Sequence, residues 1–263
     1  MRPLSARNPR VQRLGRLARR REERAEQRAL LVEGPVLLGT ALDAGASVLE
    51  VYVDEAAQHH QQVAAVLRRL PEWVEPWVLP AGTLDRVGDA TTSQGLAAVV
   101  ERRHAPWPAR DTTSFVLVLA DVADPGNAGT LIRAATAAGV GAVVVAGGVD
   151  PTHPKVVRAS AGAVFGVDVV SVGAPTEAVD RLRTEGFRLV GTAVNHGVPY
   201  DEADLTVPVA VVLGNEAHGL PEDLTATLDL VLTIPMVGPT ESLNVAMAGT
   251  VVCFEILRQR RSA

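Results

Sequence analysis

The sequence predicts an α/β protein with two domains, each built around a β-sheet. A chain of 263 residues is long for one ordinary domain, and its 47% of hydrophobic residues can form a substantial core. Short apolar runs alternate with stretches of helical periodicity along the chain, which is typical of sheets covered by helices. The polar segment RRHAPWPARDTTS at residues 102–114 interrupts this alternation and is interpreted as an interdomain linker.

Before the linker, the sequence predicts a basic helical arm at residues 1–28 and a small α/β domain at residues 29–101. Val11, Leu14 and Leu17 recur at helical spacing, so we expect a helix over about residues 9–28. The expected strands are Ala29–Val32, Leu49–Val53, Val74–Leu79 and Leu96–Val100, and the expected helices are Pro35–Ala44, His60–Leu70 and Ala81–Val87.

After the linker, residues 115–263 predict a doubly wound domain with a mostly parallel sheet. The run Phe115–Ala120 is apolar at every position, as expected of a strand covered on both faces. Further strands are expected at Ala142–Ala146, Val167–Val172, Phe187–Ala193, Val209–Leu213 and Leu230–Ile234. Helices are expected at Gly126–Ala138, Thr176–Glu185 and Ser242–Arg260.

The composition excludes several classes of protein. The single cysteine, Cys253, leaves no internal disulfide and no cysteine-clustered zinc site. No apolar run approaches the roughly 18 residues needed to span a bilayer, and residues 1–28 lack the apolar stretch of a secretory signal. These observations favour a cytoplasmic protein.

Charge is distributed unevenly along the chain. Residues 1–28 hold ten arginines and three glutamates, whereas the whole chain carries a net charge of −5. A basic arm on an acidic body suggests contact with a polyanion such as RNA, although a solvated helix that only improves solubility fits the same pattern. The arginines that we expect to contact RNA phosphates are Arg10, Arg13, Arg16, Arg19 and Arg20.

Three segments rich in glycine and polar residues follow predicted strands. They are DVADPGNAGTLIRAATAAG at 121–139, VVLGNEAHGL at 211–220 and IPMVGPTESLNVAMAG at 234–249. Ligands of parallel sheets bind beyond the carboxyl ends of the strands, where these segments lie. Taken singly, each segment is equally compatible with an ordinary turn or a capped helix. The cap residues that we expect are Asn127 for the first helix and either Ser242 or Thr240 for the last. The fingerprints GxGxxG, GxxxxGK[ST] and GxSxG are absent, which disfavours a dinucleotide-dependent oxidoreductase, a P-loop enzyme and a hydrolase.

Together and in this order, the three segments closely resemble the three motifs of the SpoU (TrmH-like) RNA 2′-O-methyltransferases. The similarity covers residues 115–263 almost continuously and includes RASAGAVF at residues 158–165. Residues 29–101, with RALLVEGPVLLGTAL near their start, are similar to the RNA substrate-binding domain that many members carry.

The resemblance implies a C-terminal α/β trefoil-knot domain that binds S-adenosylmethionine (AdoMet) and needs no metal. In this family the knot forms the cofactor pocket, and members are usually homodimers whose active sites take residues from both subunits. Carried over position by position, the pocket residues are Thr192, Ala193, Leu213, Gly214, Asn215, Ile234, Met236 and Leu243.

The reaction implied is methyl transfer to a ribose 2′-hydroxyl of structured RNA. Arg133 matches the catalytic arginine of the family, and because a guanidinium is a poor base we expect it to bind a phosphate and stabilise alkoxide charge. Glu216 is expected to orient Arg133. Asn127 and Asn244 are expected to hold the ribose and phosphate, and Ser242 to contact the same backbone or the cofactor carboxylate.

The resemblance favours 23S ribosomal RNA as the substrate, because members with this N-terminal domain often act there. Two alternatives stay open on the sequence. One is a tRNA ribose 2′-O-methyltransferase, and the other is a catalytically silent RNA-binding factor on the same fold.

Overall fold

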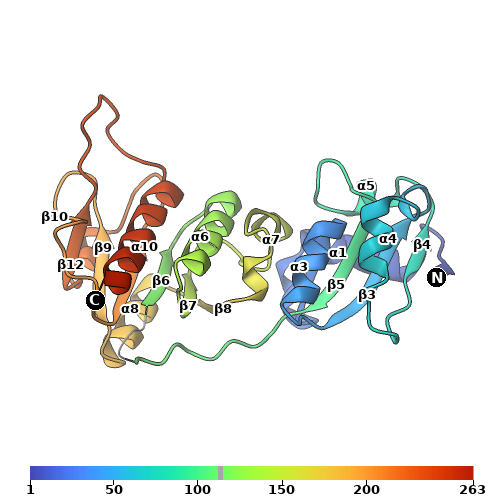
Figure 1. Cartoon of the computed structure of the whole chain (residues 1–263), viewed down its shortest axis with the longest axis horizontal. Coiled ribbons are helices and arrows are strands. Elements are labelled where there is room, and N and C mark those ends of the chain that lie inside the picture. Colours follow the sequence, from blue (N-terminus) through green and yellow to red (C-terminus); the bar gives the residue numbers. More distant parts are fainter. Residues whose placement is uncertain (112–114, 263) are drawn as a thin grey trace. The chain divides into compact units, whose positions relative to one another are not determined.

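The computed structural model describes residues 1–111 and 115–262, which form two compact units (Figure 1). The first unit contains residues 1–104 and 152–165, and the second contains residues 105–151 together with the chain from 166 onward. Residues 112–114 of the predicted linker lie outside the described part of the chain. Over the described residues, no helix has both the length and the apolar character needed to cross a bilayer.

The first unit is built on a five-stranded mixed sheet in the order β1-β4-β3-β5-β2. β5 runs antiparallel to β2 and β3, and the other pairs are parallel. β4 begins later than predicted because Pro76, which precedes it, has no N–H to donate to a ladder. The strands are β1 (Arg2–Pro3), β2 (Ala29–Glu33), β3 (Val48–Asp54), β4 (Trp77–Leu79) and β5 (Leu96–Glu101).

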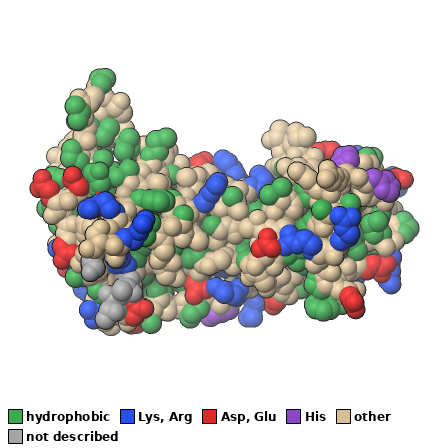
Figure 2. All heavy atoms as spheres, in the orientation of Figure 1, with side chains coloured by type: hydrophobic (Ala, Val, Ile, Leu, Met, Phe, Trp, Pro, Cys, Tyr) green, Lys and Arg blue, Asp and Glu red, His purple; other side chains and the backbone are tan. Residues whose placement is uncertain are grey.

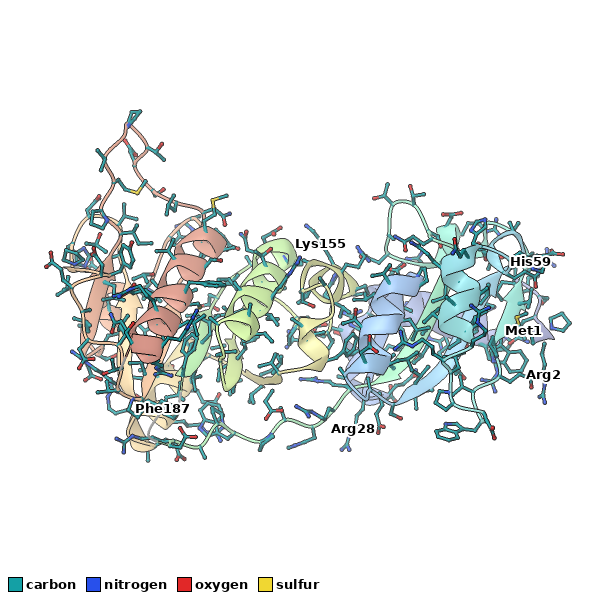
Figure 3. The ribbon with its side chains drawn as sticks, viewed as in Figure 1. Met1, Arg2, Arg28, His59, Lys155 and Phe187 are labelled. Atoms are coloured by element: carbon teal, nitrogen blue, oxygen red, sulfur yellow. The ribbon has the colours of Figure 1, made fainter. Side chains whose placement is uncertain are left out.

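The edge strand β1 was not predicted, since two residues carry no periodic signal. Its backbone bonds to β4, with Arg2 N–H donating to the carbonyl of Pro76 at 3.0 Å. Met1 and Arg2, which are labelled in Figure 3, both form ion pairs with Glu75, at 3.4 and 2.7 Å respectively. These contacts fix the N-terminus of the chain at the edge of the sheet.

Helices cover both faces of the first sheet. The predicted basic helix is found as two helices because Arg20 adopts an extended conformation between them. Alternate strand residues face two apolar clusters, one with Leu14 and Leu17 of α1 and the other with Leu38 of α3 and Val63 of α4. The helices are α1 (Pro9–Arg19), α2 (Arg21–Glu26), α3 (Pro35–Asp43), η1 (Glu55–Ala57), α4 (Gln61–Leu67) and α5 (Thr83–Val87).

The basic arm is therefore part of the core of the first unit and not a separate segment. The side chains of Val11, Leu14 and Leu17 are at most 1% exposed. Burying three aliphatic side chains of this size contributes several kcal/mol, at about 1.5–3 kcal/mol each. Removing residues 1–28 would take away this part of the core together with the arginines.

Residues 152–165 return to the first unit, although the sequence assigned them to the domain at 115–263. They form α7 (Pro154–Ala159) and η2 (Ala163–Phe165), and Val157 is fully buried in the cluster that contains α3 and α4. The Arg158 guanidinium pairs with Glu33 at 2.5 Å and with Asp89 at 2.6 Å. Arg24, only 1% exposed, donates to Thr152 Oγ1 at 3.1 Å. Apolar burial and these polar contacts explain why the segment groups with the first unit.

The second unit contains a seven-stranded sheet in the order β10-β12-β9-β11-β6-β7-β8, and every pair is parallel. β6, β7 and β11 are buried at every position, as their apolar runs predict. The two-residue strand β10 was not predicted. The strands are β6 (Phe115–Ala120), β7 (Ala142–Ala146), β8 (Asp168–Val172), β9 (Arg188–Thr192), β10 (Val198–Pro199), β11 (Val209–Leu213) and β12 (Leu230–Thr233).

Helices pack on both faces of this sheet. Ala210 and Val212 of β11 lie in the cluster with α8, whereas Leu213 points to the opposite face. There a Cβ on Gly249 of α10 would lie 2.4 Å from both Leu131 of α6 and Leu213, so glycine allows α10 to approach α6 and the sheet. The helices are α6 (Pro125–Ala137), α8 (Pro175–Thr184), α9 (Glu222–Thr225) and α10 (Val245–Ser262).

Candidate functional site

Three neighbouring strands, β9, β11 and β12, end at the same edge of the parallel sheet. Thr192 at the end of β9 is paired with Leu232 of β12, and Val212 of β11 is paired with Gly191. The sequence-predicted cofactor residues that follow these strands therefore share one edge: Thr192 and Ala193, then Leu213, Gly214 and Asn215, then Ile234. Met236 and Leu243 lie in the segment 234–244, which leads from β12 to α10.

The loop after β11 closes tightly on itself. Asn215 N–H donates to the carbonyl of Gly219 at 3.1 Å, and Gly219 N–H donates back to Asn215 at 2.9 Å. A Cβ on Gly214 would lie 2.3 Å from the Gly219 carbonyl carbon, closer than real Cβ atoms come, so only glycine fits. The Asn215 side chain donates to the carbonyl of Asp121 at 2.9 Å and accepts from Ala217 N–H at 2.9 Å. Asn215 thus joins the loops that follow β6 and β11.

The carboxylate of Glu216 holds the start of α6. It accepts hydrogen bonds from the N–H groups of Ala123 and Asp124, both at 3.0 Å, and from Asn127 Nδ2 at 2.9 Å. Partial burial raises the pKa of Glu216, but the three donated hydrogen bonds outweigh it and hold that pKa below the ordinary value. Glu216 is therefore a charged acceptor that fixes the loop between β6 and α6.

Asn127 links this carboxylate to the C-terminal helix. Asn244 Nδ2 donates to Asn127 Oδ1 at 3.0 Å, and Asn244 Oδ1 accepts from Ala246 N–H at 2.8 Å. Glu216, Asn127 and Asn244 form one connected chain of hydrogen bonds, which we call the Glu–Asn–Asn network. It joins the loop after β11, the first turn of α6 and the first turn of α10.

The helix caps differ from those that the sequence suggested. Asp124, not Asn127, caps α6, because its carboxylate accepts from Asn127 N–H at 2.9 Å. Asn244, and neither Ser242 nor Thr240, caps α10, which begins at Val245. Asp124 precedes Pro125, and an acidic residue directly before a first-turn proline is a start signal that could have identified it.

Within this chain Arg133 does not contact Glu216, so the expectation that Glu216 orients it stays a prediction. Within the described residues, the Glu216 carboxylate bonds to positions 123, 124 and 127 and forms no ion pair with Arg133. Arg133 lies six positions after Asn127 on α6, which at 3.6 residues per turn places their side chains about 120° apart. Arg133 is exposed on the surface of the helix, and Ser242 is exposed in the segment 234–244.

The arginines of α1 are partly neutralised by the first unit itself. Arg10 and Arg13 both form ion pairs with Glu50, and Arg16 pairs with Glu23 at 3.1 Å. Arg19 donates to the carbonyl of Arg86 at 2.8 Å, and Arg20 is exposed at the break between the helices. Figure 2 accordingly shows basic and acidic side chains interspersed on the face that it draws. In the part of the chain that the structure describes, no three His, Cys, Asp or Glu side chains gather as a metal site.

Comparison with known proteins identifies the family to which this chain belongs. Residues 114–254 match the SpoU rRNA Methylase family, and residues 8–98 match the MRM3-like substrate binding domain. Because the first match alone covers more than half of the chain, the protein belongs to the SpoU rRNA methylase family. The predicted family is confirmed.

Individual relatives are similar to this protein over nearly the whole chain. The 23S rRNA (guanosine(2553)-2′-O)-methyltransferase RlmP of Bacillus subtilis is 33% identical over 237 residues, covering 90% of this chain and 91% of RlmP. The SpoU methyltransferase AviRb from Streptomyces viridochromogenes, solved with AdoMet, has a TM-score of 0.86 at 31% identity, covering 98% of this chain and all of AviRb (100%). An AdoMet-bound rRNA methyltransferase from Sinorhizobium meliloti has a TM-score of 0.83 at 27% identity, with 98% of each chain covered.

These matches confirm the predicted α/β fold class and the predicted class of enzyme, an AdoMet-dependent RNA 2′-O-methyltransferase. They do not test the individual site residues. Those residues stay predictions, now with known positions in the fold.

Proposed function

We propose that this protein transfers a methyl group from AdoMet to a ribose 2′-hydroxyl of 23S ribosomal RNA. The observation that carries the proposal is the Glu–Asn–Asn network, which joins all three sequence segments at the carboxyl edge of the sheet. The 33% identity to a 23S rRNA 2′-O-methyltransferase over 90% of the chain supports the choice of substrate.

The strand ends fit AdoMet by the chemistry that they present. Backbone groups of residues 192–193, 213–215 and 234 converge at one edge, and Gly214 lets the chain approach closely without a side chain. Ile234, Met236 and Leu243 would supply apolar contacts for the adenine and the methionine chain, whereas Leu213, whose side chain is buried beside Gly249, would contribute only backbone groups. AdoMet supplies an already activated methyl group on a sulfonium, so the protein has to hold the hydroxyl in line and accommodate its proton.

We assign to Arg133 the role of stabilising the negative charge that develops during methyl transfer. Its exposed guanidinium can bind an RNA phosphate and stabilise negative charge on the 2′-oxygen. Asn127 and Asn244 position the ribose, and Ser242 contacts the cofactor carboxylate or nearby backbone. Glu216 acts as a positioning residue, because its oxygens bond to the loop that starts α6.

Assembly and RNA contact complete the proposal. We assign a homodimer in which the exposed apolar side chains of α10, Met247 at 63% and Phe254 at 45% exposure, contribute to contact between copies. We also assign a trefoil knot to the path of the chain after β9, a cytoplasmic location and chemistry without a metal. Arg20 and its neighbours on α1 supply phosphate contacts, whose strength falls with salt.

The test is a methyl-transfer reaction with labelled AdoMet and, separately, unmodified ribosomal RNA and tRNA. Nuclease digestion then locates the label. Label on a ribose 2′-oxygen of large-subunit ribosomal RNA supports the proposal, and label only in tRNA replaces it with the tRNA enzyme. AdoMet binding without label in either RNA would indicate a catalytically silent RNA-binding protein.

A further inference from the structure

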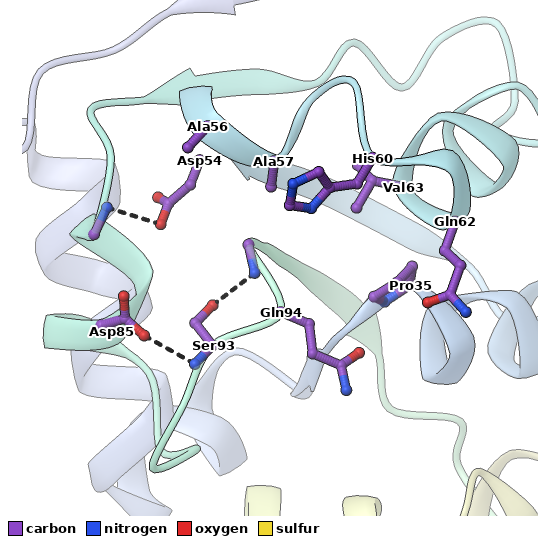
Figure 4. Close-up of a pocket in the computed structure, with 12 residues that line it drawn as sticks. Pro35, Asp54, Ala56, Ala57, His60, Gln62, Val63, Asp85, Ser93 and Gln94 are labelled. Carbon is purple, nitrogen blue, oxygen red and sulfur yellow. Dashed lines mark hydrogen bonds between the residues drawn. The ribbon is translucent and has the colours of Figure 1, made fainter.

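The first unit contains a cavity that the methyl-transfer site does not use. Its volume is 420 Å³, within the range of about 300–1,000 Å³ typical of small-molecule sites. Figure 4 shows side chains entering it from the end of β3, the start of α4, α5 and the loop before β5. The polar side chains that line it are Asp54, His60, Gln62, Asp85, Ser93 and Gln94.

One wall of this cavity is fixed by hydrogen bonds to backbone groups. Asp54 is only 4% exposed, and its carboxylate accepts from Gly82 N–H at 3.1 Å and from Leu84 N–H at 3.3 Å. Asp85 accepts from Ser93 N–H at 2.8 Å, and Ser93 Oγ accepts from Gly95 N–H at 3.0 Å. These bonds join three separate segments, so the hollow is held open by the fold.

A second group of polar side chains in the lining is not engaged in hydrogen bonds of this kind. Among the described residues, His60, Gln62 and Gln94 form no side-chain hydrogen bond or ion pair with the rest of the chain, yet all three line the cavity. Each carboxamide offers both donors and an acceptor, and the imidazole offers a flat face for stacking. Ala56 and Val63 add apolar surface beside them.

The charges of the side chains that line the cavity determine which part of a nucleotide it can bind. Two carboxylates and no arginine or lysine line the cavity, so a phosphate is repelled and a planar group with N–H donors is favoured. Sequence-specific RNA recognition commonly takes unstacked bases, which are stacked on side chains and hydrogen-bonded along their edges. Guanine presents two adjacent N–H donors on its Watson–Crick edge, and the exposed Asp85 carboxylate, which bonds to Ser93 N–H through Oδ1, is the acceptor that suits them.

We propose that this cavity receives one unstacked nucleobase of the RNA substrate, with guanine preferred, and so sets the register of the RNA on the first unit. The inference rests on the proposed function in one respect only, namely that RNA is the ligand. The base bound here is distinct from the nucleotide that is methylated, because the cavity and the AdoMet edge belong to different units.

The experiment measures RNA affinity with matched pairs of variants. His60→Ala and Gln62→Ala remove lining side chains, and Ala56→Phe fills the cavity without removing a polar group. His59→Ala and Gln61→Ala change identical residue types next in sequence that do not line the cavity. We expect Kd for unmodified large-subunit ribosomal RNA to rise about tenfold in the three lining variants, as for loss of one stacked base, and to stay unchanged in the two controls.

A scan of the RNA identifies the base. In a short fragment that the wild-type protein binds, abasic nucleotides are introduced one position at a time. At one position, the abasic substitution should weaken binding by the wild-type protein and have no further effect on binding by Ala56→Phe. Replacing guanosine by inosine at that position should also weaken binding by the wild type. Thermal unfolding of each variant, compared with its control, separates loss of binding from loss of folding.

The outcomes distinguish this inference from the function proposed above. Folded lining variants that bind RNA like the wild type would overturn it, as would an abasic scan with no position that depends on the cavity. If no RNA is methylated but binding still depends on the cavity, the base-binding site stands and the proposed reaction fails. AdoMet affinity should be the same in all five variants.

Discussion

The Glu–Asn–Asn network leads to a sharp prediction for Glu216. Replacing Glu216 with alanine removes the acceptor for two backbone N–H groups and for the Asn127 amide. A hydrogen bond to a charged acceptor contributes about 1.5–3 kcal/mol when buried. Glu216 is exposed, and solvent screening reduces this to about 1 kcal/mol for each bond. We therefore expect Glu216→Ala to lower the stability of the second unit by about 2–3 kcal/mol.

Thermal unfolding followed by calorimetry measures this loss. For a unit of this size, about 2–3 kcal/mol corresponds to a decrease in Tm of roughly 4–12 °C. Glu202→Ala, an exposed glutamate in the same unit, serves as the control and should melt like the wild type. The Tm of Glu216→Gln should lie between those of the wild type and Glu216→Ala. One of the two terminal groups of glutamine is an NH₂ donor, and here it would face other donors.

The pH dependence provides a second measurement on the same variants. Because the folded-state pKa of Glu216 lies below its ordinary value of 4.5, its stabilising effect is present above that value and is lost as the pH falls through the folded pKa. The difference in stability between wild type and Glu216→Gln should therefore shrink below about pH 4.5. A Glu216→Ala protein that lost methyl transfer but kept the wild-type Tm and acid profile would refute the positioning role.

Three further predictions concern other parts of the structure. Arg133→Ala should abolish methyl transfer while AdoMet affinity by calorimetry and Tm stay unchanged, since Arg133 is exposed, and full activity would disprove its assignment. Arg24→Met should destabilise the first unit by about 3 kcal/mol in denaturant unfolding, because the carbonyl of Leu17 and Thr152 Oγ1 lose their buried donor, and an unchanged midpoint would contradict this. Gly214→Ala should weaken AdoMet binding by at least tenfold, because its Cβ would lie 2.3 Å from Gly219, whereas Gly238→Ala, with open space around its Cβ, should bind normally.

The sequence predicted the strands well where burial leaves a strong signal. β6, β7 and β11 are uniformly apolar and were found at the expected residues. The break at Arg20 could not be predicted, since neither glycine nor proline marks it and the basic pattern continues across it. Helix α7 has only six residues, too few for helical periodicity to be visible, and its burial depends on contacts with distant strands.

For the candidate site, the sequence located the segments but not the contacts within them. Parallel strands end at one edge, so their following residues had to converge. The bonds of Glu216 join positions 89 to 93 residues apart, and no local pattern specifies which partner a carboxylate selects over that distance. Arg133 was expected near Glu216 because both match family motifs, but within one chain the helical angle between Asn127 and Arg133 separates the two side chains.

The return of residues 152–165 to the first unit affects how the protein can be made and divided. The chain passes between the two units three times, after residues 104, 151 and 165. During synthesis, the first unit stays incomplete until α7 has left the ribosome, by which time β6, α6 and β7 of the second unit have already emerged. A single cut within residues 105–111 yields no complete module on either side, because one fragment lacks the partner of Glu33 and the other exposes Val157. The two units therefore have to be expressed and folded together in one chain, although each has a core of its own.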